Sequence, residues 1–72
     1  QRLKCIGGPL YGFEYSHSQD EFTFIDKQTG KETLYHKQIL NFKPPQAFFV
    51  AETTPNHFAY FLALQLIGHI KM

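Results

Sequence analysis

Residues 53–71 read TTPNHFAYFLALQLIGHIK, and this stretch decides whether the fold contains a helix. Thr54 suits the N-cap of a helix and Pro55 suits its first position. We therefore expect a helix over residues 57–71, rich in leucine and alanine. A strand is the alternative, because apolar residues also alternate along part of this stretch. The alternating residues are Phe58, Tyr60, Leu62, Leu64 and Leu66.

The expected helix is apolar almost all round. At about 100° per residue it carries two stripes. One stripe contains Ala59, Ala63, Leu66, Ile67 and Ile70. The other contains Phe58, Phe61, Leu62, Gln65 and His69. A membrane span would explain such a helix, but its apolar run is shorter than the roughly 20 residues required. We expect the first stripe to cover a sheet and the second to form an oligomer interface.

Strand-like segments fill the chain before this helix. The segments 3–6, 11–15, 21–26, 32–42 and 47–52 are separated by glycine, proline or polar loops. The rings of Tyr11, Phe13 and Tyr15 alternate, so we expect them to share one face of the second strand. The sequence predicts an α+β fold: a twisted antiparallel sheet of four or five strands with one C-terminal helix packed across it. Residues 1–72 are expected to form a single small domain.

Composition narrows the function classes. The 72 residues carry a net charge of +1 and no run of like charge, which disfavours general nucleic-acid binding. The single cysteine and the absence of a signal-like segment favour a reducing compartment. A chain this short buries only about 60% of its unfolded surface, so a homo-oligomer would add the burial that it lacks. Aromatic residues make up 17%, more than one small core needs.

No catalytic or metal-binding pattern emerges. The four histidines, His17, His36, His57 and His69, lack neighbouring ligands at the spacings typical of zinc sites. Cys5 lies inside an expected strand, where a buried and inert thiol is the simplest interpretation. We therefore expect neither an enzyme nor a cofactor or metal site.

A binding site for an anion is better supported. Successive backbone N–H groups at Gly7 and Gly8 can form a concave anion site, and the helix start near Thr54 and Asn56 is another. Nearby side chains could add charge or a stacking surface for a base. The candidate side chains are Arg2, Lys4, Tyr11, Tyr15 and Tyr35. The alternative is a purely structural turn and an ordinary helix cap.

Residues 2–12, RLKCIGGPLYG, resemble the opening of a diverse set of short, largely uncharacterised bacteriophage proteins. Those proteins begin with a strand followed by Gly-Gly-Pro-x-Asp-Gly, and here Tyr11 stands where Asp is usual. The segments 34–36 and 48–55 follow in the corresponding order, so the resemblance spans most of the chain. It implies a phage origin, an α+β fold and the cytoplasm of an infected bacterium, but no particular chemistry.

These observations leave three functional hypotheses. The first is a non-enzymatic phage accessory protein that counters host defence by sequestering a small nucleotide-type signal at an oligomer interface. The second is a phage protein that binds and inhibits a host protein. The third is a small structural or virion-associated protein whose assembly is its function.

Overall fold

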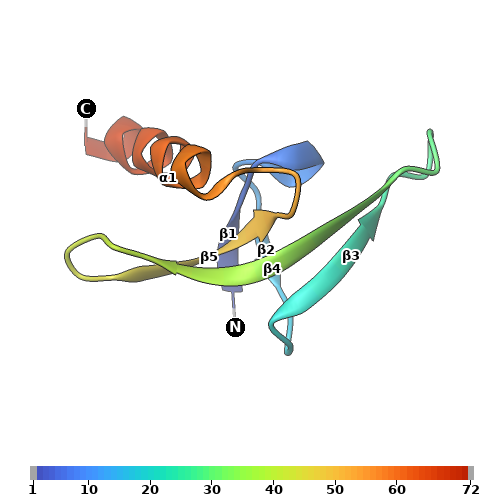
Figure 1. Ribbon diagram of the computed structural model, residues 1–72, viewed down its shortest axis with the longest axis horizontal. Coiled ribbons are helices and arrows are strands. Elements are labelled where there is room, and N and C mark those ends of the chain that lie inside the picture. Colours follow the sequence, from blue (N-terminus) through green and yellow to red (C-terminus); the bar gives the residue numbers. More distant parts are fainter. Residues whose placement is uncertain (1, 72) are drawn as a thin grey trace.

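The computed structural model describes residues 2–71, with side chains as far as residue 68, and consists of one sheet and one long helix (Figure 1). The C-terminal stretch is helical, so the strand alternative is wrong. The elements in chain order are β1 (Arg2–Ile6), the 3₁₀ turn η1 (Gly8–Leu10), β2 (Glu14–Ser16), β3 (Glu21–Ile25), β4 (Glu32–Leu40), β5 (Gln46–Ala51) and α1 (Asn56–Lys71).

The five strands form a mixed sheet in the order β2-β1-β5-β4-β3. The predicted α+β class, with one C-terminal helix on a small sheet, is confirmed. One detail differs, because β1 runs parallel to β5 while the other neighbours are antiparallel. The strands β3, β4 and β5 form an antiparallel meander, which ends with β5 alongside β1 and running in the same direction. The pattern of residues within a strand does not reveal the direction of its distant neighbour.

One face of the sheet encloses an aromatic core. The buried members of this inner core are Cys5, Phe22, Tyr35, Phe49 and Ala51. The Phe22 ring stacks on Tyr35 at 5.2 Å between centroids and meets Phe49 edge-on at 4.9 Å. Tyr15 of β2 also stacks on Phe22 of β3, at 4.1 Å. Since β2 and β3 are the two edges of the sheet, the sheet curls until side chains from opposite edges touch.

The helix covers the other face. The buried members of this outer core are Ile6, Leu40, Phe48, Val50, Ala59 and Ala63. Ala59 and Ala63 are fully buried, and Leu66 and Ile67 pack at the margin. Phe58 and Phe61 point outward, so burial follows the two predicted stripes. Leu62 is an exception, because it was predicted to lie on the outward stripe but is half-buried against the outer core. The side chains of His69 and Ile70 lie outside the described residues.

The second strand is shorter than predicted. It begins only at Glu14, because the chain first turns through η1 and through Gly12, whose φ is 88°. Tyr11 therefore lies in the turn rather than in the strand, and its hydroxyl donates to the Leu62 carbonyl of α1 at 3.2 Å. The prediction that Tyr11, Phe13 and Tyr15 share one strand face is wrong.

Candidate ligand groove at the glycine turn

A buried tyrosine anchors the glycine turn after β1 through two hydrogen bonds. Gly7 and Gly8 have φ values of 75° and 64°, a region that residues with a side chain rarely adopt. The Tyr35 hydroxyl donates to the Gly7 carbonyl at 2.8 Å and accepts from the Leu10 N–H at 2.9 Å. Because Tyr35 is fully buried on β4, the turn is anchored in the inner core.

Both glycines also meet neighbours that leave no room for a side chain. A methyl group on Gly8 would lie 2.7 Å from the Tyr35 hydroxyl oxygen and 3.2 Å from Cβ of Ala51. A methyl group on Gly7 would overlap the hydroxyl of Thr54. The turn is therefore packed directly against the segment that joins β5 to α1.

This packing creates a groove between the glycine turn and the start of the helix. Its volume is about 370 Å³, and its lining residues are Gly7, Gly8, Thr53, Thr54, Pro55, Phe58 and Leu62. The two predicted anion-binding features, more than 40 residues apart in the chain, thus line one groove. Phe58 and Leu62 were expected at an oligomer interface, and no signal in the sequence links them to the glycine turn.

The helix begins differently from the prediction. The Pro55 carbonyl accepts the first helical bond, from the Ala59 N–H at 2.9 Å, and α1 starts at Asn56. Thr54 instead closes a turn, since its N–H donates to the Ala51 carbonyl at 2.9 Å. Pro55 thus takes the cap position predicted for Thr54, whose side chain lies against Gly7. Thr54 lines the groove all the same. Asn56, two residues further along the chain, is exposed and is not part of the groove lining.

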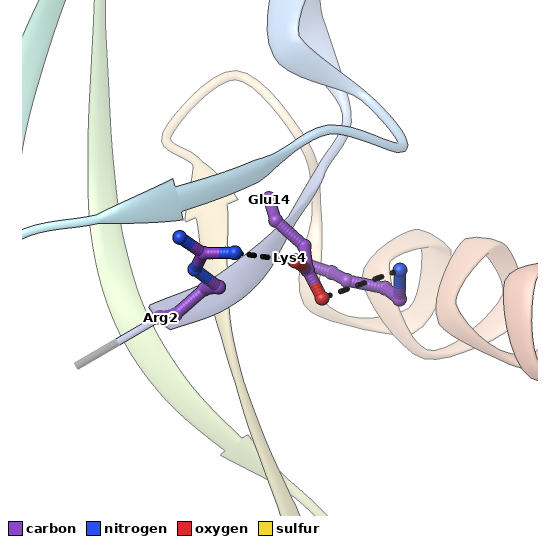
Figure 2. Close-up of polar contacts among 3 residues, drawn as sticks. All are labelled: Arg2, Lys4 and Glu14. Atoms are coloured by element: carbon purple, nitrogen blue, oxygen red, sulfur yellow. Dashed lines mark ion pairs between the residues drawn. The ribbon is translucent and has the colours of Figure 1, made fainter.

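The two predicted basic residues lie outside the groove lining. Arg2 and Lys4 project from the same face of β1, and both pair with Glu14 of β2 (Figure 2). The N–O distances are 3.6 Å and 3.7 Å, and the side chains remain partly exposed. Such surface pairs contribute little to stability. Glu14 nevertheless offsets the positive charge that these residues would offer an anion.

The three predicted stacking tyrosines are not brought together. Tyr11 packs on the helix side, whereas Tyr15 and Tyr35 belong to the inner aromatic cluster. Tyr35 has no exposed ring face on which a base could stack, and burial raises the pKa of its hydroxyl. The aromatic ring that lines the groove is that of Phe58, which is 53% exposed.

A second hollow adjoins the glycine turn on the side away from the helix. It measures about 270 Å³ and shares Gly8 and Thr53 with the groove. Asp26, Lys31 and Glu32 contribute charges of both signs to it. These charges come from the β3–β4 hairpin, and the sequence offers nothing that places this hairpin beside the glycine turn.

Cys5 is buried in the inner core, and burial raises its pKa from 9.0 to about 11. The thiol is therefore protonated at neutral pH and unsuited to nucleophilic attack. Across the residues that the structure describes, no group of three or more His, Cys, Asp or Glu side chains is placed to hold a metal ion. The same part of the chain contains no helix that is long and apolar enough to cross a membrane.

The chain was also compared with known proteins. No protein-family model, curated protein or solved structure matches it. The candidate site therefore rests on the geometry of the groove alone.

Proposed function

We propose that this protein is a non-enzymatic binding protein whose groove holds a small ligand with an anionic group and a flat apolar part. Nucleotides combine these two features. The observation that carries the proposal is the convergence of residues 7–8 and 53–55 on one groove beside Phe58.

The chemistry of the groove supports both parts of such a ligand. Glycine turns present backbone N–H groups to an anion, and the N-terminus of a helix carries a partial positive charge. Phe58 supplies a ring on which a base can stack, a contact worth about 1–3 kcal/mol per base. The groove lining contains no charged side chain, so a singly phosphorylated ligand suits it better than a highly charged one.

The biological role that we propose is sequestration. The resemblance of residues 2–12 to phage proteins favours an accessory protein that binds a nucleotide signal of the infected host and so counters host defence. A binding protein of this kind needs no catalytic group.

The first test is native mass spectrometry of protein purified gently from bacterial cells, followed by calorimetric titration with a panel of nucleotides. The decisive variant is Asn56→Asp, at the first residue of α1. A carboxylate there should stabilise the helix by about 0.3–1 kcal/mol. It should also weaken binding of an anion in the groove roughly tenfold by charge repulsion.

The matched control is Asn41→Asp, which makes the same charge change at an exposed residue just after β4. We expect this variant to bind the ligand like the wild type. If Asn56→Asp and Asn41→Asp bind equally well, or if no nucleotide binds the wild type, the proposed ligand site is wrong.

A host-protein target is the second candidate function. The observation that favours it is the apolar outer face of α1, where Phe58 and Phe61 are each 53% exposed. A stable complex with one host protein that Asn56→Asp leaves intact and Phe61→Glu abolishes would support this alternative.

A further inference from the structure

The outward face of α1 is apolar and carries no charge. Phe58, Phe61 and Leu64 follow one another about a turn apart, and their exposed fractions are 53%, 53% and 46%. His57 and Gln65 are exposed polar residues on the same face, and Tyr60 lies at its margin. Residues 56–68 contain no Asp, Glu, Lys or Arg. A single exposed apolar residue needs no explanation, but a continuous stripe of this kind marks an interaction surface.

The total surface of the chain is also larger than that of a compact monomer. The accessible area is 5248 Å² for a chain of 8.4 kDa. Monomeric proteins of this mass expose about 4,600 Å², so the excess is about 600 Å². A stable dimer of standard size buries about 800 Å² on each partner. The excess, summed over the whole molecule, is thus about three quarters of the area that one partner buries in such a dimer.

We propose that a second copy of this chain covers the outward face of α1, with the two helices packed antiparallel across a two-fold axis. A neutral apolar face offers no charges that would select a charged partner, but it is complementary to itself. In the antiparallel arrangement the positive N-terminal end of each helix also lies near the negative C-terminal end of the other. The two-fold axis places the same residues on both sides of the interface.

The interface adjoins the groove of the proposed function without depending on it. Phe58 lines the groove and also stands at the first turn of the apolar face. The second copy would therefore stand beside the groove and shield it from water. Self-association is measured without ligand, so its outcome is separate from that of the nucleotide titration.

The test is sedimentation equilibrium of the full chain, together with native mass spectrometry. The wild type should give twice the 8.4 kDa chain mass. Phe61→Glu and Leu64→Glu should each weaken dimerisation by at least about 100-fold, because each change occurs twice in a symmetric interface. Glutamate is a good helix former, so circular dichroism should show the helix intact in both variants. Phe61→Gln provides a milder change if a glutamate variant does not fold.

The matched control is Ile39→Glu. Ile39 lies on β4 and is 69% exposed, more than Phe58, Phe61 or Leu64. Its neighbour Leu40 packs in the core beneath the helix, so alternation along the strand places Ile39 on the opposite face of the sheet. We expect Ile39→Glu to remain dimeric. A monomeric wild type overturns the proposal and leaves the face to a foreign protein. A dimer that Ile39→Glu disrupts and Phe61→Glu spares overturns it in favour of the exposed surface of β4.

Discussion

The two faces of the sheet bury their apolar side chains in different ways. The inner face fills itself, because the curl brings rings from β2, β3, β4 and β5 into one cluster around Phe22 and Phe49. The outer face cannot close on itself and needs α1 as a cover. The inner core is built from large rings, whereas the helix contributes two alanines, Ala59 and Ala63, to the deepest positions.

This difference explains why the helix carries exposed apolar side chains. Alanines let the helix approach the sheet closely, so its larger side chains at Phe58, Phe61 and Leu64 remain outside. The inner face is thus self-contained, whereas the helix keeps apolar side chains exposed. The glycine turn connects the two, since Tyr35 anchors it from the inner core while it packs on the start of the helix.

The largest expected effect separates buried from exposed rings. Phe49→Ala removes a fully buried ring that belongs to the inner cluster, and it should lower the free energy of unfolding by about 3–5 kcal/mol. Phe13→Ala makes the same change at a ring that is 63% exposed, and it should cost no more than about 0.5 kcal/mol. Urea unfolding of both variants measures the difference. Equal losses would contradict the self-contained inner core.

An intermediate effect tests the anchor of the glycine turn. Tyr35→Phe removes the hydroxyl that satisfies the Gly7 carbonyl and the Leu10 N–H, and it should cost about 1–3 kcal/mol. Tyr11→Phe removes only a 3.2 Å bond to Leu62, a carbonyl inside the helix. That carbonyl keeps its helical partner, so the loss should be smaller. Thermal unfolding of the two variants decides whether the inner core or the helix holds the turn.

The last expected effect, which is absent at neutral pH, is a dependence of stability on alkaline pH. Burial raises the pKa of Cys5 from 9.0 to about 11, so the unfolded chain releases the thiol proton before the folded chain does. Stability should therefore be constant below about pH 9 and fall as the pH rises toward 11, by at most about 1.4 kcal/mol per pH unit. Burial raises the pKa of Tyr35 in the same direction.

The variant Cys5→Ala separates the two contributions. This variant should lose the decrease in the free energy of unfolding that begins near pH 9. The contribution of Tyr35 at higher pH should remain. The measurement is the free energy of unfolding of both proteins as a function of pH. An unchanged slope in Cys5→Ala would show that the thiol is solvated rather than buried in the inner core.

Local pattern was sufficient for most secondary structure. The two-residue alternation in 21–26, the apolar segment 47–52 and the proline before the helix predicted strands and a helix that the structure contains. The same reasoning failed at Tyr11, because alternation cannot distinguish a strand from a turn that continues past Gly12. It also cannot report direction between distant strands, and so it missed the parallel pairing of β1 with β5.

The candidate site was predictable only in pieces. Gly7, Gly8 and Thr54 were singled out for backbone chemistry, and they do line one groove. Arg2 and Lys4 were singled out for charge, but cross-strand pairing places Glu14 opposite Lys4. Tyr35 was singled out as a surface ring, although it is buried beneath the turn. Residue type indicates what a side chain can do, whereas pairing and burial decide whether it is available.

The amino-acid sequence determined the elements of this protein, because local conformational preferences and the period of apolar residues act over a few neighbouring residues. Two consecutive glycines predicted a tight turn, and the leucine- and alanine-rich stretch after a proline favoured a helix over a strand. The tertiary structure alone decided that the turn and the helix start meet, since residues 7–8 and 53–55 are joined only through the order of strands in the sheet. The curl that stacks Tyr15 on Phe22 is likewise a property of the assembled sheet, because it brings together two edges that never pair along the chain.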